Sequence, residues 1–564
     1  MRGLVRCSVL LLFTPAVLGA QTPLPRKHAP QPTVPAITAN DLMTRLYIFS
    51  DDSMMGREAG TLGNVKGTDY IAAQFKQMGV QPAGDDGTYF QTIPYKTRAL
   101  DTTSTVVVGG TPLKLGDDYL PLGQEPVALL DLPVVYGGVV GDTTHPLARD
   151  EAAGKLVVLA RPSGPMGRRF FRGASVEGAA AVAVVGLDQL PARFRGFMTR
   201  PRAFLDDPAA TGPAGGTPSL LISDAAATKI FGRPISQLAV GSAGERVSMH
   251  LRFDVKPMPY PARNVVGIIP GSDPKLAGEY VALGAHNDHL GESDTPVDHD
   301  SIMIWNHVVR PEGADDRGNT ATYAQQREVD SLLPLYRSRH PGQDRMDSIW
   351  NGADDDGSGT VSLLEIAQYV MAMKPHPKRS ILLVSHVGEE KGLLGSRYFT
   401  NHPTVPRDSI VAQLNMDMIG RGDATDETGR TKDGIPRHGG PNYVLLVGSR
   451  RLSTELGNIV ERVNRVDHHD LTFDYSLDAN GHPSNIYCRS DHAEYARFGI
   501  PIVFFTTGLH SDYHQVTDEP EYIDYPHMAR VASLVADVAV HVADLDHRVV
   551  VDHPKPDPNA ACRQ

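Results

Sequence analysis

The second half of the chain alternates short apolar segments with amphipathic segments, and this order constrains the fold more than any other feature. From residue 264 onward the apolar segments are NVVGII, YVALGA, ILLVSHV, SIVAQLNM, YVLLVG and IPIVFFTT. Segments such as TVSLLEIAQYVMAMK place apolar residues at helical spacing between them. Strands that alternate with helices build a sheet that helices cover on both faces. We therefore predict an α/β fold with three layers around a mixed β-sheet.

The first residues have the pattern of a targeting signal. Arg2 and Arg6 precede an apolar run, and the small residues Gly19 and Ala20 follow it. This pattern predicts a signal peptide over residues 1–20, cleaved after Ala20, and hence a secreted, periplasmic or extracellular protein. No later segment is apolar over the roughly 18 residues that a membrane span requires, so we expect no membrane span.

Charge and cysteine content exclude some partners and limit cross-linking. A formal net charge of −12 argues against nucleic acid and anionic membranes, which require basic patches. Without the signal peptide only Cys488 and Cys562 remain, which allows a single disulfide in an oxidising compartment. Stability must therefore come mainly from packing of the core.

Changes in composition predict the domain boundaries. A Pro-rich leader, residues 21–37, is expected to be a tether, and residues 38–125 begin with a helix, a loop and a second helix closed by Gly79. Residues 126–256 hold β-like segments between Pro-rich passages, which indicates an inserted β-rich domain whose ends lie close together. The main domain then continues through residues 257–548, and residues 549–564 are expected to form a flexible tail.

Acidic and histidine residues follow the apolar segments, where the predicted strands end. His286 and Asp288 follow YVALGA, Glu389 and Glu390 follow ILLVSHV, and Asp417 follows SIVAQLNM. IPIVFFTT leads into GLHSDYHQVTDEP, and the acidic motif NGADDDGSG precedes a predicted helix. Ligand sites in open α/β sheets form beyond the carboxyl ends of the strands, so we expect these five segments to meet at one edge.

Mixed imidazole and carboxylate ligands suit zinc, and two ions about 3.5–4 Å apart need a carboxylate that touches both. The pattern therefore favours a site for two zinc ions. Each motif alone has a simpler interpretation, because acidic residues favour the start of a helix and acidic turns are often only solvated. A calcium loop is excluded, since aligning Gly357 with the invariant glycine of an EF-hand puts Leu363 where the bidentate glutamate belongs.

Six motifs, taken in order, closely resemble those of the M28 family of dizinc aminopeptidases: AHNDHLG, NGADDDGSG, VGEEKGLLGSRYF, LNMDMIGR, RSDHAEYARFGIP and TTGLHSDYH. The resemblance covers residues 264–545 and the N-terminal segment SDDSMMGREAGT. It implies a fold of the zinc exopeptidase type and the release of N-terminal amino acids from peptides with a free N-terminus by zinc-activated water. The block 126–256 is similar to the protease-associated domain that is often inserted in secreted members.

The resemblance also implies a role for each matching residue. Asp355 corresponds to the carboxylate that bridges the two zinc ions. Glu390 and His514 correspond to the other ligands of one ion, and His286 and Asp417 to those of the second. The remaining matches are Glu389 as the general base, Asp288 as the residue that orients His286, and Tyr513 as a hydroxyl that helps to stabilise the oxyanion.

The stretch 292–350 is longer than a minimal family member needs, and we expect it to form a lid or a specificity wall near the site. It contains GADDRGN, which makes Asp315 or Asp316 a rival of Asp355 as the bridging ligand, although the rival motif lacks the Ser-Gly pair. Other histidines near the motifs are expected to be structural or to lie behind the ligands: His289, His386, His492 and His510.

Two other functions remain open. A dizinc carboxypeptidase of the glutamate carboxypeptidase type would share the ligands but need a basic pocket, for which Arg421 and Arg489 are candidates. A receptor-like binding protein with an inactive site should have lost ligands, whereas all are present here. The sequence has no Gly-x-Ser-x-Gly and no His-Glu-x-x-His motif, which argues against a serine hydrolase and a single-zinc protease.

Overall fold

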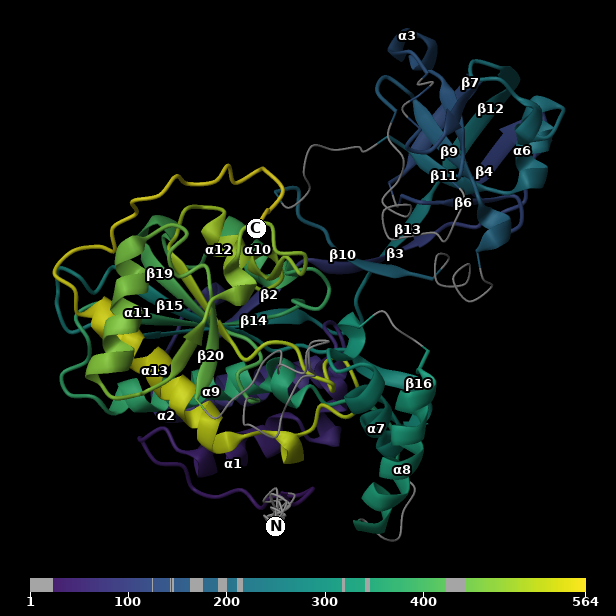
Figure 1. The fold of residues 1–564 in the computed structure, drawn as a ribbon. Helices are drawn as coiled ribbons and strands as arrows, with labels where there is room; N and C mark the ends of the chain where they lie inside the picture. The colour runs from purple at the N-terminus through teal and green to yellow at the C-terminus, as the bar shows by residue number, and fades with distance from the viewer. Residues whose placement is uncertain are drawn as a thin grey trace, which may run out of the picture.

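The structure is a computed structural model in which two separate β-sheets dominate (Figure 1). The predicted signal peptide lies outside the described residues. No helix in the described part of the chain is long and apolar enough to cross a membrane. The described residues are 24–123, 125–142, 144, 147–162, 176–190, 200–209, 217–316, 320–339, 345–421 and 442–564.

The larger sheet has nine strands in the order β1-β14-β18-β15-β19-β22-β20-β21, with β2 paired to β14. Its centre, β18-β15-β19-β22, is parallel, whereas β14 and β20 run antiparallel to their neighbours β18 and β22. The sheet is therefore mixed, as the sequence predicts. Its strands are β1 (Gln81–Pro82), β2 (Phe90–Ile93), β14 (Ala262–Ile269), β15 (Tyr280–His286), β18 (Ser380–His386), β19 (Ile410–Met416), β20 (Tyr443–Val447), β21 (Thr472–Asp474) and β22 (Ile502–Thr506).

Helices cover both faces of this sheet, which confirms the predicted three layers (Figure 1). Alternate residues of β15 show why its sequence is apolar throughout: Val281 and Leu283 enter one core and Ala282 enters the other. The core with Val281 is closed by α1 (Ala39–Phe49), α2 (Leu62–Met78), α9 (Gly359–Ala372), α11 (Thr454–Val466) and α13 (Tyr525–Ala543), and the other by α10 (Leu394–Asn401) and α12 (His492–Ala496).

The smaller sheet has eight strands in the order β5-β4-β12-β7-β8-β9-β11-β6. The chain reaches it through β3 (Tyr95–Leu100) and returns through β13 (Phe253–Pro257), which pair antiparallel in a separate ribbon with β10 (Arg202–Leu205). The ends of the inserted block therefore lie side by side (Figure 1). Its strands are β4 (Thr105–Val108), β5 (Thr111–Pro112), β6 (Tyr119–Pro121), β7 (Val127–Val139), β8 (Leu156–Ala160), β9 (Ala181–Val185), β11 (Ser219–Ile222) and β12 (Ala243–Leu251).

The boundary that we predicted for the inserted block, residue 126, is too late. Strands β4, β5 and β6 precede it and belong to the same sheet as β7 to β12. The reason is a pairing between distant segments: β4 lies antiparallel to β12, with Val106 opposite Met249. Local composition does not reveal such a pair.

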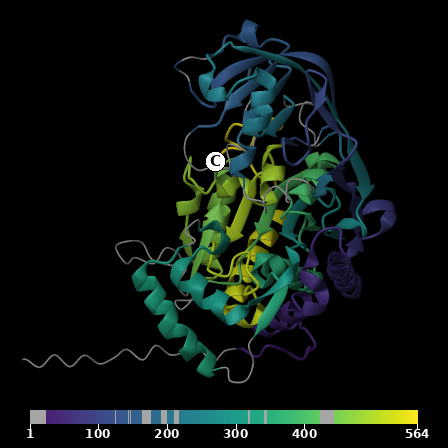
Figure 2. The same cartoon turned by 90° about the vertical axis from the view of Figure 1, so that its right-hand side faces the viewer.

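The described residues of the stretch 292–350 form a helical hairpin beside the main domain (Figures 1 and 2). Strands β16 (Gly291–Asp298) and β17 (Met346–Trp350) pair antiparallel at its base. Helices α7 (His299–Val309) and α8 (Tyr323–Arg339) pack on each other around a small apolar cluster. We call residues 292–350 the hairpin insert.

The leader and the tail are attached to the main domain, so the predictions of a tether and a flexible tail are wrong for the described residues. In the leader, the Tyr47 hydroxyl donates to the carbonyl of Pro25 at 2.5 Å, and Thr33 donates to Gln368 at 2.9 Å. In the tail, Cys562 forms a disulfide with Cys488. Polar and Pro-rich composition suggested mobility, but these partners become visible only in the folded chain.

Candidate metal centre

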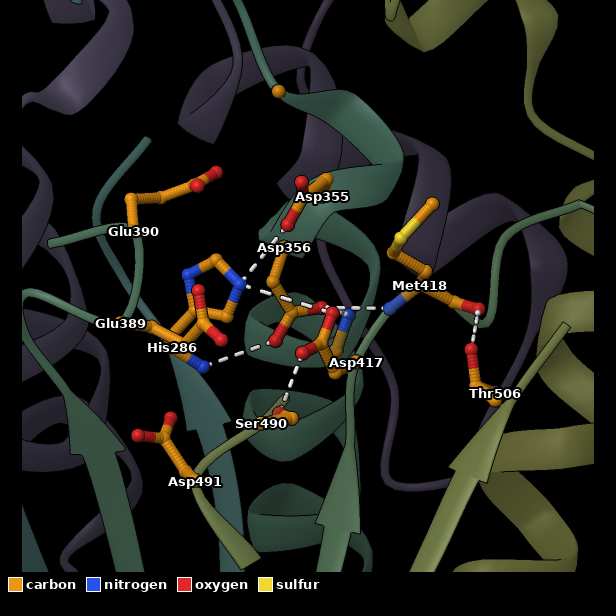
Figure 3. A network of polar contacts seen from close by, with 12 residues as sticks. His286, Asp355, Asp356, Glu389, Glu390, Asp417, Met418, Ser490, Asp491 and Thr506 are labelled. Atoms are coloured by element: carbon orange, nitrogen blue, oxygen red, sulfur yellow. Dashed lines mark hydrogen bonds and ion pairs between the residues drawn. The ribbon is translucent and has the colours of Figure 1, made fainter. Parts of the chain in front are cut away.

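The predicted segments meet at the carboxyl edge of the parallel strands (Figure 3). His286 ends β15, Glu389 and Glu390 follow β18, and Asp417 follows β19. Asp355 lies in the buried turn that precedes α9 and faces them. Side chains that are far apart in the sequence therefore converge on one small volume, as the position of the strand ends predicts.

Asp355 contributes to two groups of candidate metal ligands. Its Oδ1 lies 3.0 Å from Nε2 of His286, and its Oδ2 lies 3.0 Å from Nε2 of His514. His286, Asp355 and Asp417 form the first group, with their ligand atoms within 4.8 Å of one another. Asp355 thus lies between the two groups and belongs to both.

The second group contains a histidine that we did not predict as a ligand. His289, Asp355 and Glu390 place their ligand atoms within 4.8 Å of one another. His514, the predicted ligand, has Nε2 at 3.0 Å from Oε2 of Glu390 as well as from Asp355. The spacing in HNDH could have pointed to His289, because it follows the predicted pair His286 and Asp288 directly.

The donor atoms of the second group fit a cation. Nδ1 of His289 lies 2.8 Å from Oε1 of Glu390, at ion-pair distance, but neither atom makes a hydrogen bond of good geometry among the described residues. Burying a carboxylate oxygen without a partner is costly, and a bound cation removes that cost. Histidine nitrogens combined with carboxylates are a donor set that suits zinc. The residues present therefore fit the metal that the motifs imply.

The electrostatics of these groups favour ionised Asp355 and Glu390 and a protonated His514, whose imidazole must release that proton to bind a metal. Burial would raise the pKa of Asp355, but hydrogen bonds with His286 and His514 hold that pKa well below its usual range. Burial and the charge of Asp355 oppose ionisation of Glu390, yet His289 and His514 lower its pKa to about 2. Burial would lower the pKa of His514, whereas Asp355 and Glu390 raise it to about 10.

Glu389 has the opposite electrostatic character. Burial raises its pKa well above the usual range, and Asp417 and Glu390 raise it further, although His286 opposes them. Its backbone N–H donates to Oδ1 of Asp288 at 3.1 Å. Nδ1 of His286 lies 3.1 Å from the backbone carbonyl of Asp288 and 3.7 Å from its carboxylate. The Asp288 carboxylate therefore holds the backbone of Glu389 more closely than it holds His286.

Two further residues, which sequence reasoning missed, support the first group (Figure 3). The carboxylate of Asp356 accepts the backbone N–H groups of His286 at 3.0 Å and Met418 at 3.3 Å, and so ties two strand ends together. Ser490 donates its hydroxyl to Oδ2 of Asp417 at 2.6 Å. Both residues lie inside quoted motifs, NGADDDGSG and RSDHAEYARFGIP, but the motifs alone did not reveal these contacts.

An apolar pocket opens beside the candidate centre. Its polar side is lined by Asp355, Glu389, Asp417, Arg489, Ser490, Thr506 and Tyr513. Tyr513 is buried, and its ring stacks on that of His514 with centroids 3.9 Å apart. The apolar side is lined by Met418, Leu477, Ile486, Phe504 and Leu509.

The rival acidic motif contributes no ligand to either group. Asp315 pairs with Arg489 at 2.5 Å, and Asp316 accepts the backbone N–H of Glu312 at 2.8 Å. Three of the four remaining histidines lie outside both groups. His386 contacts the Tyr495 hydroxyl at 3.0 Å, His492 the Tyr487 carbonyl at 2.8 Å and His510 the Asp354 carboxylate at 3.1 Å.

The structure thus defines an α/β protein with a candidate dinuclear metal centre. Residues 329–539 match Peptidase family M28. This stretch contains most of the motifs quoted above, and the match agrees with the family that those motifs resemble.

Curated relatives match parts of the chain. Leucine aminopeptidase 1 of Paracoccidioides brasiliensis (strain Pb03) is 28% identical over 202 residues, which cover 34% of this chain and 47% of that protein. A vacuolar membrane protease of Verticillium alfalfae is 50% identical over 52 residues, or 9% of this chain and 5% of that protein. The chain therefore spans less than half the length of either relative.

Solved structures also resemble the chain. A zinc aminopeptidase from Bacillus subtilis is 16% identical, with a TM-score of 0.44 over 90% of this chain and 95% of that one. An aminopeptidase from Aneurinibacillus sp. strain AM-1 is 16% identical, with a TM-score of 0.45 over 92% of this chain and 97% of that one.

Proposed function

We propose that this chain is a secreted metallo-aminopeptidase that binds two zinc ions and releases N-terminal amino acids from peptides. The observation that carries the proposal is the position of Asp355, whose two oxygens each lie 3.0 Å from a histidine of a different ligand pair. A shared carboxylate between two buried groups is the arrangement that a pair of metal ions requires. The match of residues 329–539 to family M28 supports the same proposal.

The ligands would divide between the two ions as the motifs imply. Asp355 would bridge them, Glu390 and His514 would hold one, with His289 as a further candidate ligand of that ion, and His286 and Asp417 would hold the other. When bound, the ions would supply an activated water and polarise the carbonyl of the scissile peptide bond.

Glu389 would transfer the proton, and Tyr513 would stabilise the negative charge that develops on the substrate oxygen. The raised pKa of Glu389 suits a group that takes a proton from water and returns it to the leaving amine. Its backbone N–H is held by the carboxylate of Asp288. The Tyr513 hydroxyl would donate a hydrogen bond to the oxyanion of the tetrahedral intermediate.

The pocket supports a preference for apolar N-terminal residues. Its wall beyond Asp417 is built from aliphatic, sulfur and aromatic side chains, and burying a leucine-sized side chain there contributes roughly 1.5–3 kcal/mol. A charged side chain would lose its hydration there, and the one cationic side chain among the described residues that line the pocket, Arg489, is already paired with Asp315. Peptides that begin with leucine, methionine or phenylalanine are therefore the expected substrates.

The two arginines that a carboxypeptidase would need are already engaged. Arg421 pairs with Asp512 at 2.6 Å, and Arg489 pairs with Asp315 at 2.5 Å. A terminal carboxylate would have to displace an existing ion pair at either residue. This favours recognition of a free amine over recognition of a free carboxylate.

The proposal also includes secretion of the protein and the identity of the inserted sheet. The Cys488–Cys562 disulfide is consistent with an oxidising environment and hence with secretion through the predicted signal peptide. We assign the eight-stranded sheet, which runs from β4 to β12, as the protease-associated domain that the sequence resembles. The hairpin insert would form one wall of the site entrance.

A paired peptide assay tests the function. The mature protein is loaded with zinc and incubated with a leucine-initiated peptide that is either free or acetylated at its N-terminus, with and without chelator. We expect single residues to leave only the free peptide and the chelator to stop the reaction. Trimming of the acetylated peptide from its carboxyl end would replace this proposal with the carboxypeptidase, and no cleavage by the zinc-loaded protein would indicate a binding protein.

A further inference from the structure

We infer that Asp315, in the hairpin insert, is a positioning residue for the candidate centre, because it holds Arg489 against the hydroxyl of Tyr513. The inference rests on the proposed function and adds to it a residue from outside the matching motifs. It also gives the hairpin insert a role that is more specific than a wall.

The contacts form a continuous path from the insert to the pocket. Nη1 of Arg489 lies 2.5 Å from Oδ2 of Asp315, and Nη2 of the same guanidinium donates to the Tyr513 hydroxyl at 3.1 Å. A planar guanidinium presents its N–H groups in a rigid fork. Fixing one side of the fork on Asp315 therefore fixes where the other side meets Tyr513.

The turn that carries Asp315 is built directly against the backbone of Tyr513. The N–H of Ala314 donates to the Tyr513 carbonyl at 3.2 Å. A Cβ at Gly313 would lie 2.6 Å from that carbonyl oxygen and 2.8 Å from the carbonyl oxygen of His510, and φ at Gly313 is +58°. Only glycine allows this approach, so the turn and the Tyr513 loop are closely packed.

The direction of the hydrogen bond between Arg489 and Tyr513 explains how the contacts from Asp315 to Tyr513 would assist catalysis. An arginine donates hydrogen bonds and cannot accept them, so the Tyr513 oxygen must be the acceptor in its contact with Arg489. The phenolic proton is therefore directed away from Arg489 and remains available to a substrate oxygen. Tyr513 lines the pocket together with Asp355 and Glu389, which places this proton next to the reacting groups.

Asp315 also determines which carboxylate forms the ion pair with Arg489. The side chains of Arg489 and Asp315 are about one-third exposed, at 32% and 34%, so the pair lies at the edge of the pocket. Without Asp315, the Arg489 guanidinium would lose its fixed partner. It would then be free to pair with the carboxylates of the two candidate ligand groups. The Tyr513 hydroxyl would then lose both its donor partner and its fixed orientation.

The test compares Asp315→Ala with wild type in zinc-dependent cleavage of a leucine-initiated peptide. We expect Asp315→Ala to lower kcat about tenfold, with KM changed by less than about twofold, because the lost interaction acts mainly in the transition state. Zinc content and melting temperature should stay at the wild-type level, and Asp315→Glu should restore part of the rate. Asp330→Asn removes the same charge from an exposed position on α8 and should behave as wild type.

A double-mutant cycle separates positioning from a general structural effect. In a Tyr513→Phe background, Asp315→Ala should lower kcat by less than about twofold further, because the group that it positions is gone. An equal loss in both backgrounds, or an unchanged kcat in Asp315→Ala, would overturn the inference while the proposed function stands. Asp315→Asn replaces the alanine variant if the latter does not fold. A zinc-loaded wild type without aminopeptidase activity would overturn the proposed function itself, and the inference with it.

Discussion

His492 links the protonation of a buried ring to the stability of the segment that carries Arg489 and Ser490. Its ring is fully buried and stacks on Phe504, with centroids 4.6 Å apart. Nε2 lies 2.8 Å from the Tyr487 carbonyl, whereas Nδ1 has no hydrogen-bond partner among the described residues. Burial lowers the pKa of His492 from 6.5 to about 4, although the Tyr487 carbonyl opposes the shift.

The sign and the size of the pH effect follow from this difference. The neutral ring donates its Nε2 proton to Tyr487, and protonation would add an N–H at Nδ1 that finds no acceptor. Between pH 6.5 and about 4 the unfolded chain binds the proton and the folded chain does not, so stability falls as the pH falls. Relative to pH 7, the loss from this one group is about 2 kcal/mol at pH 5 and about 3 kcal/mol at pH 4.

The assay is urea unfolding of wild type and His492→Gln at pH 7 and pH 5, followed by circular dichroism. A glutamine amide can still donate to the Tyr487 carbonyl but does not titrate. The free energy of unfolding of wild type should therefore fall by about 2 kcal/mol more than that of the variant between the two pH values. The exposed residue His250, changed to Gln as a matched control, should leave the pH dependence of wild type unchanged. Equal pH dependence in wild type and His492→Gln would refute the reasoning.

Three further predictions concern the centre and the tail. Glu389→Gln should retain two zinc ions by elemental analysis but lower kcat at least about a hundredfold, and near-normal turnover would remove Glu389 as the base. Asp355→Ala should reduce bound zinc below two ions per chain, because one side chain serves both groups; full zinc content would contradict a bridging role. Cys562→Ser opens a loop with a sequence separation of 74 and should cost about 4 kcal/mol of unfolding free energy, and Cys488→Ser should match it.

Local pattern determined the main fold and the position of the centre. The alternation of apolar and amphipathic segments is a property of neighbouring residues, and it required a sheet with helices on both faces. Parallel strands bring their carboxyl ends to one edge, so His286, Glu389, Glu390 and Asp417 could be expected to meet before any contact was known. The structure places them there, around Asp355.

Tertiary packing decided which of these residues contact one another and which additional residues lie at the candidate centre. His289 approaches Glu390 and Asp356 joins two strand ends, and although both lie within quoted motifs, the motifs do not reveal these contacts. The start of the inserted sheet depends on a pairing of β4 with β12, and the tail is held by its disulfide. Asp315 looked like a rival ligand and instead reaches Arg489. In each case the partners are distant in the chain, so the contact depends on how whole elements pack and leaves no periodic trace in the sequence around either partner.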